Sequence, residues 1–321
     1  MPCNWGILGP GFVATRAVIP AIQQTQGAHL LAVASTDNER AQQAAAKFGI
    51  ERIYHDYQSL LNDPDVDAVY ISLPNHLHHT WTIRAAEAGK HVLCEKPLAT
   101  NAAECKDMIA ACQKADVLLM EAVMYRFHPR MLHLKHMLMN GELGDIRLLH
   151  AAFSFPFDQP HNYRARPEFG GGALLDTGSY CVNAARWLIG SEPLHILAET
   201  TYNQETKIDM NTSAVLCFND NVLAHIQCSF AAAEHQVIEV VGSRAAATAP
   251  NAFTAWREDT TTLMIQRGAM FERLEFPPAD PYLLMVAHFT DCVLGRAKLL
   301  FPATDARRTL SVLDALRANR G

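Results

Sequence analysis

The chain has 321 residues, of which 49% are hydrophobic and 19% charged, and this length exceeds that of a usual single domain. Its formal net charge of −6 comes without a run of lysine or arginine that could neutralise adjacent phosphates, so we expect no nucleic-acid partner. No segment approaches the ~20 apolar residues that cross a bilayer, and the N-terminus has no basic flank or cleavage site of an export signal. We therefore expect a cytoplasmic protein that does not associate with membranes.

The first part of the chain alternates short apolar runs with helical patterns, which is typical of a parallel sheet with crossover helices. The expected strands cover residues 4–8, 30–35, 67–73, 91–95 and 118–122. The expected helices cover residues 14–24, 38–48, 79–88 and 102–115. This α/β pattern predicts a doubly wound Rossmann domain over residues 1–123.

After residue 123 the pattern changes to that of an α+β domain. A helix is expected before Asn140-Gly141, and a second one over residues 174–188. The expected strands cover residues 146–155, 194–202, 212–218, 222–231 and 236–242. Their spacing predicts a large, mostly antiparallel open sheet in a domain over residues 124–303. A last helix, over residues 305–318 of the segment 304–321, is expected to pack back on the first domain.

A glycine-rich turn follows the first expected strand: Gly9-Pro10-Gly11-Phe12-Val13-Ala14. In a strand–turn–helix unit, Gly9 permits a tight bend and Gly11 lets the backbone approach phosphates, while the helix N-terminus supplies N–H donors. Such glycines are also found in turns that bind nothing. Because three further βα units follow, we expect the turn with Phe12 and Val13 to bind the pyrophosphate of a nicotinamide dinucleotide.

The second expected strand ends at Ser35-Thr36-Asp37, where NAD enzymes place an acid on the adenosine ribose. A hydroxyl at Ser35 removes repulsion against a 2′-phosphate, and Arg40 can pair with that phosphate. Asp37 argues for NAD instead. Both cofactors remain open, and the balance of these contacts favours NADP over NAD.

Lys96 follows the strand expected over residues 91–95, at the carboxyl edge where open α/β sheets bind ligands. Glu95 can orient the ammonium group, and Pro97 ends the strand. We expect Lys96 to lie where cofactor and substrate meet.

At this point the sequence resembles the glucose-fructose oxidoreductase, inositol dehydrogenase and MocA (GFO/IDH/MocA) family. The resemblance rests on the glycine turn, Pro74-Asn75-x-x-His78, Ala88-Gly89-Lys90-His91-Val92 and Glu95-Lys96-Pro97. The segments EAVMYRFHP (residues 121–129) and GGGALLDTGSY (residues 170–180) are similar to the branch with dimeric dihydrodiol dehydrogenases, NADP-linked xylose dehydrogenases and sugar ketoreductases.

The resemblance implies an NAD(P)-dependent oxidoreductase that acts on a sugar, cyclic polyol or keto-sugar. It implies that Lys96 touches substrate and nicotinamide, that Asp176 lies in the substrate pocket, and that position 180 supplies the acid/base. It also implies a homo-oligomer, a dimer or tetramer, that assembles through the C-terminal sheet. The remaining expected cofactor contacts are Leu73, Pro74, Asn75, His78, Glu95 and Arg126.

Many family members have histidine where this chain has Tyr180. A phenol with a pKa near ~10 is a poor base at neutral pH, but an adjacent ammonium such as Lys96 favours the phenolate. Asp176 and Tyr180 are four residues apart, so on a helix they share one face. Arg164 precedes the glycine-rich segment and is expected either to bind substrate hydroxyls or to lie on the surface.

Other site types have weaker support. His76, His78 and His79 form a poor metal-ligand set without a suitably placed carboxylate, and the eight cysteines contain no Cys-x-x-Cys pair, so we expect no metal and reduced thiols. Two other functions remain as alternatives: an NAD-dependent glycosidase without net redox change, and a cofactor-binding regulator without catalysis.

Overall fold

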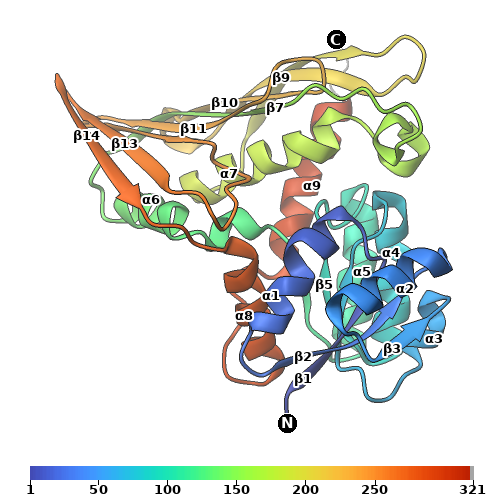
Figure 1. Ribbon diagram of the computed structural model, residues 1–321. Helices are drawn as coiled ribbons and strands as arrows, with labels where there is room; N and C mark the ends of the chain where they lie inside the picture. The colour runs from blue at the N-terminus through green and yellow to red at the C-terminus, as the bar shows by residue number, and fades with distance from the viewer. Residues whose placement is uncertain (319–321) are drawn as a thin grey trace. The chain divides into compact units, whose positions relative to one another are not determined.

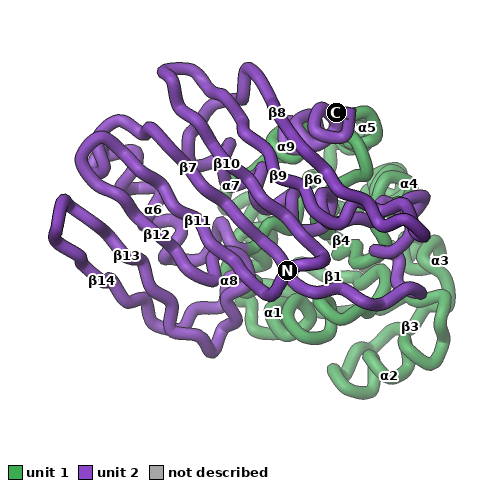
Figure 2. Tube along the Cα trace, turned by 90° about the horizontal axis from the view of Figure 1, so that it is seen from above, with its two compact units in different colours: residues 1–124, 282–307 green, residues 125–281, 308–321 purple. Residues whose placement is uncertain are grey.

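The computed structural model of the protein describes residues 1–318. The chain forms two compact units, coloured separately in Figure 2. Unit 1 contains Met1–Met124 and Tyr282–Arg307, and unit 2 contains Tyr125–Pro281 and the chain from Arg308 onward. Each unit has its own sheet.

The sheet of unit 1 has six parallel strands in the order β3-β2-β1-β4-β5-β6, the strand order of a Rossmann domain. The strands are β1 (Cys3–Leu8), β2 (Ala28–Ala34), β3 (Arg52–Tyr54), β4 (Ala68–Ile71), β5 (His91–Cys94) and β6 (Leu119–Glu121). β1 and β4 are almost wholly buried, as expected for central strands covered on both faces. The parallel sheet and five of its strands confirm the sequence prediction.

Three helices of unit 1 begin at a side-chain cap. Asp37, Asp56 and Asn101 each accept a backbone N–H at the N-terminus of α2 (Asn38–Phe48), α3 (Tyr57–Leu61) and α5 (Ala102–Lys114). The first helix combines a π-helical turn, Ala14–Val18, with α1 (Ile19–Gln24). α4 (Asn75–Glu87) starts four residues earlier than expected, directly after Pro74.

α8 (Pro281–Val293) was not predicted, and from Tyr282 on it belongs to unit 1 rather than to the second domain. The ring of Phe289 lies 5.6 Å from that of Trp5 on β1, and both side chains are fully buried. Burying two large aromatic rings contributes several kcal/mol, about 1.5–3 kcal/mol for each ring. This contact explains why the segment returns to the first sheet.

The sheet of unit 2 has eight strands in the order β14-β13-β12-β11-β7-β10-β9-β8 (Figure 2). They are β7 (Ile146–Ser154), β8 (His195–Tyr202), β9 (Asp209–Cys217), β10 (Leu223–Ser229), β11 (His235–Gly242), β12 (Ala246–Pro250), β13 (Thr261–Arg267) and β14 (Met270–Phe276). All neighbours are antiparallel except β7 and β10, which run parallel from Leu148↔Leu223 to Ser154↔Ser229. The expected large, mostly antiparallel sheet is thus confirmed.

The two faces of this sheet differ. α6 (Pro129–Met139) and α7 (Ser179–Ile189) lie on one face (Figure 1), which we call the inner face. On β10, Ala224 and Ile226 are buried toward the inner face, whereas Leu223 and Gln227 are exposed on the other, outer face. This alternation with period two is that of a sheet buried on one side.

α9 (Ala303–Ala318), which was expected to pack on the first domain, belongs to unit 1 up to Arg307 and to unit 2 from Arg308 onward. There Thr309 accepts a hydrogen bond from Nη1 of the buried Arg186 at 2.7 Å. Residues 319–321 of the expected segment 304–321 lie outside the described residues. Within residues 1–318, no helix combines the length and apolarity that a bilayer crossing requires, and the cytoplasmic location stays a prediction.

Candidate active site

The glycine turn after β1 has the geometry that a dinucleotide pyrophosphate requires. Gly9 has φ +83°, and a Cβ there would lie 2.7 Å from Leu73 Cδ2 and 2.9 Å from the Ser72 carbonyl oxygen, so only glycine fits. The helix begins at Phe12, and the first N–H groups of a helix have no intrahelical acceptor. These free donors and the helix dipole form an anion site, so the turn fits the cofactor.

The carboxyl end of β2 places Ser35, Asp37 and Arg40 together. Ser35 is buried, and its Oγ accepts the Asp37 N–H at 3.1 Å. The Asp37 carboxylate caps α2 by accepting the Arg40 N–H at 3.1 Å, and its Oδ2 lies 3.6 Å from Arg40 Nη2. The Asp37 carboxylate is therefore occupied at the N-terminus of α2, while the Arg40 guanidinium is mostly exposed.

The carboxyl end of β5 carries Glu95 and Lys96. The phenol of Tyr70, buried in β4, donates a short hydrogen bond to Glu95 Oε1, and Glu95 Oε2 accepts the Lys96 backbone N–H at 3.2 Å. Burial raises the pKa of Tyr70 well above its ordinary value, and the charge of Glu95 adds to this. Tyr70 therefore stays a neutral donor and fixes the carboxylate next to Lys96. The Lys96–Pro97 peptide bond is cis.

His78, expected to approach the cofactor, is fully buried on α4. Its Nδ1 lies 2.8 Å from the Pro97 carbonyl oxygen, and its Nε2 lies 2.8 Å from the Leu73 carbonyl oxygen. Burial lowers the pKa of His78, whereas these two carbonyls raise it. The imidazole thus links the loop after β4 to the loop after β5, and a contact with the cofactor remains a prediction.

In unit 2, three expected substrate residues lie together: Arg164, Asp176 and Tyr180. Arg164 Nε donates to Asp176 Oδ2 at 2.8 Å, and Nη2 lies 3.4 Å from Oδ1. Burial disfavours the Arg164 cation, but the charges of Asp176, Tyr163 and Tyr180 outweigh it and raise its pKa. Arg164 therefore interacts electrostatically with Tyr180 as well as with Asp176.

The ring of Tyr180 is held by aromatic neighbours. Its centroid lies 5.4 Å from that of Phe253, 5.5 Å from Phe153 and 5.9 Å from Tyr125. Tyr125 is itself fixed by a 2.7 Å hydrogen bond from its hydroxyl to Asn183 Oδ1 on α7. Rings packed in this way restrict the phenol to one position.

Arg126, an expected cofactor contact, belongs to unit 2. It is buried, and its guanidinium lies 5.1 Å from the centre of the Trp187 ring. Lys96 and the glycine turn belong to unit 1, so the expected site residues divide between the units. Sequence reasoning missed Tyr70, the aromatic neighbours of Tyr180, and Asp209, which accepts the Leu174 N–H. No local spacing links these residues to the motifs.

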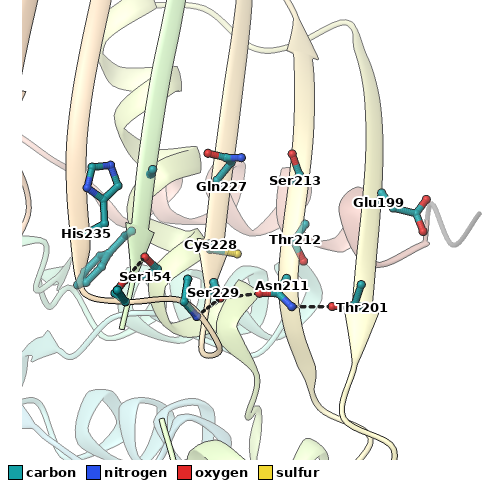
Figure 3. A pocket seen from close by; sticks show the side chains of 14 residues that line it. Ser154, Glu199, Thr201, Asn211, Thr212, Ser213, Gln227, Cys228, Ser229 and His235 are labelled. Atoms are coloured by element: carbon teal, nitrogen blue, oxygen red, sulfur yellow. Dashed lines mark hydrogen bonds between the residues drawn. The ribbon is translucent and has the colours of Figure 1, made fainter. Parts of the chain in front are cut away.

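A separate hollow of about 520 Å³ lies at the ends of strands β7–β11 in unit 2 (Figure 3). Hydrogen bonds cross its floor, from Ser229 Oγ to Asn211 Oδ1 at 2.6 Å and from Asn211 Nδ2 to Thr201 Oγ1 at 2.7 Å. The exposed Gln227 and Ser213 of the outer face also line it. Among the described residues, no three His, Cys, Asp or Glu side chains form a group that could hold a metal ion.

Comparison with known proteins follows the same division of the chain. Residues 3–123 match the family model of an oxidoreductase family with an NAD-binding Rossmann fold, and residues 131–248 match the GFO/IDH/MocA C-terminal domain. An uncharacterized oxidoreductase of Rhizobium meliloti is 36% identical over 99% of this chain and 97% of its own length. The D-xylose 1-dehydrogenase (NADP(+)) 2 of Haloferax volcanii is 35% identical over 98% of this chain and 95% of its own.

Among solved structures, the 3-ketoreductase KijD10 from Actinomadura kijaniata, in complex with NADP and TDP-benzene, superimposes with a TM-score of 0.94. It is 30% identical, and the match covers 100% of this chain and 98% of KijD10. The fold and these matches define a nicotinamide-dependent oxidoreductase. The chain belongs to the GFO/IDH/MocA family.

Proposed function

We propose that the protein transfers hydride between a nicotinamide cofactor and a hydroxyl-bearing or carbonyl carbon of a carbohydrate, cyclic polyol or keto-sugar. The observation that carries this proposal is the arrangement of Arg164, Asp176 and Tyr180 around one ion pair in unit 2. Relatives named as a xylose dehydrogenase and sugar-nucleotide 3-reductases support the same class of substrate. A fixed cation, a buried acid and a phenol are the groups that bind a polyol and move its proton.

The bound cofactor would supply or accept the hydride at its nicotinamide ring. In oxidation, the phenolate of Tyr180 would take the proton of the substrate hydroxyl; in reduction, the phenol would donate that proton to the carbonyl oxygen. Lys96 would hold the same oxygen by hydrogen bonding and favour the phenolate by its charge. The Asp176 carboxylate, held by Arg164, would accept a hydrogen bond from a neighbouring substrate hydroxyl and so orient the substrate ring.

We further propose NADP as the preferred cofactor. The Asp37 carboxylate already caps α2, so it is less available to the ribose hydroxyls that an NAD enzyme binds with an acid. The exposed Arg40 and the hydroxyls of Ser35 and Thr36 offer donors to a 2′-phosphate. The NADP named for a relative and for the KijD10 complex supports the same preference.

The test is a screen of aldoses, inositols, diols and keto-sugars with NAD and NADP, followed by the absorbance of the reduced nicotinamide. Lys96→Ala and Tyr180→Phe should each lower kcat by roughly 10²- to 10⁴-fold, the range for general acid–base groups. The Kd of the nucleotide should change little. Lys114→Ala and Tyr202→Phe change the same residue types outside the site and serve as controls. Retained turnover in either site variant would contradict these roles.

The glycosidase alternative predicts release of an aryl leaving group without a change in nicotinamide absorbance, and the regulator predicts nucleotide binding without turnover. The relatives are named as dehydrogenases and reductases, which supports net hydride transfer over both.

We also propose that two copies of the chain associate through the outer face of the unit 2 sheet. Leu148 and Leu223 are register partners on this face and are 50% and 42% exposed, and Leu197 is 67% exposed. Exposed leucines on one face of an open sheet favour burial against a second surface. Light scattering should give a dimer or tetramer for the wild type and monomers for the Leu148→Glu, Leu223→Glu double variant. Leu132→Glu, an equally exposed leucine on α6, should leave assembly unchanged; a monomeric wild type would refute the proposal.

A further inference from the structure

The segment that carries Asp176 and Tyr180 is attached at its start to the sheet of unit 2. The Leu174 N–H donates to Oδ2 of Asp209, the first residue of β9, at 2.5 Å. Leu174 begins the π-helical turn Leu174–Gly178, which contains Asp176 and leads directly into α7 at Ser179. A carboxylate at this end satisfies an N–H without an intrahelical acceptor and interacts favourably with the helix dipole.

The same carboxylate explains one glycine of the GGG sequence. Gly172 has φ +106°, and a Cβ at this position would lie 2.0 Å from Asp209 Oδ1. Gly171 approaches the other side, since its Cβ would lie 2.4 Å from the Arg164 carbonyl oxygen. The turn is therefore enclosed between Asp209 on β9 and the loop that holds Arg164.

The rest of the turn is fixed against β10 and within itself. A Cβ at Gly178 would lie 3.0 Å from Cys228 Sγ, so the backbone is in close contact with the strand. Thr177 Oγ1 donates to the Ala173 carbonyl oxygen at 3.0 Å, and Ser179 Oγ donates to that of Asp176 at 3.0 Å. A shift at Leu174 is thus transmitted to Asp176 as a displacement of the whole turn.

Holding the ionised Asp209 carboxylate at this position costs free energy. Burial raises its pKa, while the N–H groups of Leu174 and Ala173 and the charge of Arg317 on α9 act in the opposite direction. Because burial prevails, the ionised carboxylate is less favourable here than in water.

We propose that Asp209 is a positioning residue for the reaction: its carboxylate fixes the turn that presents Asp176 and Tyr180 to the substrate. This inference rests on the proposed function. It concerns the substrate half of the site, so it predicts a loss of turnover without a loss of nucleotide affinity.

The test compares Asp209→Ala, Asp209→Asn and the control Asp63→Asn. Asp63 is a buried acid of unit 1 that accepts hydrogen bonds from Arg52 at 2.7 and 2.8 Å, and the proposed reaction does not use it. Asp209→Ala should lower kcat by roughly 100-fold and raise the sugar KM, with nucleotide Kd within about twofold of wild type. Asp209→Asn keeps an oxygen that can accept the Leu174 N–H, so its kcat should lie between those of Asp209→Ala and the wild type. Asp63→Asn should reduce thermal stability and leave kcat within about twofold.

Hydrogen exchange provides a second measurement that does not depend on turnover. Amides of residues 172–178 should exchange at least tenfold faster in Asp209→Ala than in wild type, and should not change in Asp63→Asn. Wild-type kcat in a folded Asp209→Ala variant, or unchanged exchange in both Asp209 variants, would overturn the proposal. If the alanine variant does not fold, Asp209→Asn decides by the same criteria. If the wild-type protein turns over no sugar but residues 172–178 still exchange faster in Asp209→Ala, the proposed function is refuted and the anchoring by Asp209 is retained.

Discussion

The Arg164 guanidinium and the Asp176 carboxylate form an ion pair in which Nε lies 2.8 Å from Oδ2, with Asp176 almost fully buried and Arg164 partly exposed. The pair joins the 3-10 turn Tyr163–Ala165 to the π-helical turn that precedes α7, and of the two side chains that of Arg164 is the more exposed. A substrate hydroxyl can therefore approach the cation while the acid stays in place.

Arg164→Gln should lower kcat/KM for the sugar by roughly 10- to 100-fold, because hydrogen bonds to charged groups contribute about 1.5–3 kcal/mol. Nucleotide Kd should not change. Arg147→Gln removes a comparable but exposed pair with Asp145 and should have no measurable effect. Steady-state kinetics with separate titration of the nucleotide checks this; equal effects of the two variants would contradict the role of Arg164.

Tyr70→Phe removes the hydrogen bond to Glu95 without changing the volume of the core. We expect kcat to fall roughly tenfold, since the carboxylate beside Lys96 loses its fixed donor. The loss should be the same from pH 6 to pH 9, because the raised pKa of Tyr70 keeps the phenol neutral. Tyr54→Phe, which removes a hydrogen bond to Asp63, should reduce stability alone. A Tyr70→Phe enzyme with wild-type kcat would refute the link to Lys96.

His128 should make the fold sensitive to acid. Burial, and secondarily the charge of Arg130, lowers its pKa to about 4, below the ordinary value near ~6.5. The unfolded chain therefore binds more protons between about pH 6.5 and 4, and the contribution of His128 to stability is lost as the pH falls through this window. His128→Asn preserves a side-chain acceptor for the Arg130 N–H and removes the titration. Thermal unfolding from pH 7 to pH 4.5 should depend less on pH in this variant; identical slopes would show that other groups dominate.

Arg40→Ala should weaken NADP binding by about tenfold and leave NAD binding unchanged, because a charge-assisted hydrogen bond to a 2′-phosphate is worth about 1.5 kcal/mol or more. Lys47→Ala removes a positive charge from the last turn of the same helix and is the matched control. Fluorescence titration with both reduced cofactors measures the ratio. If the affinities for NADP and NAD fall by the same factor, Arg40 does not bind the 2′-phosphate.

The structural elements that the sequence predicted well are those defined by residues close together in the chain. The glycine turn, the strand before Lys96 and the helix with Asp176 and Tyr180 each depend on residues a few positions apart. β3 was missed because its three residues form no apolar run, and β12 because Ala246–Pro250 is rich in alanine, which has little preference for strands. Both form because neighbouring strands offer backbone partners.

Other parts depend on contacts between distant residues, which periodicity does not encode. Phe289 meets Trp5 across almost the whole chain, so α8 had no local sign of its place. Asp209 is 35 residues from Leu174, and only the sheet brings them together. Arg164 could be predicted as a polar residue near the site, but its pairing with Asp176 required the fold of the glycine-rich loop.

The parallel alignment of β7 and β10 has a consequence for how this enzyme class can diversify. Two parallel neighbours require a long crossover between them, and here that crossover contains Arg164, Asp176, Tyr180 and β9 with Asp209. Both of its ends are held by one pair of adjacent strands. Residues 158–163, which precede Arg164 and the glycine-rich segment, can therefore change in length and sequence to suit a different sugar without altering the strand register, so specificity can evolve separately from the fold.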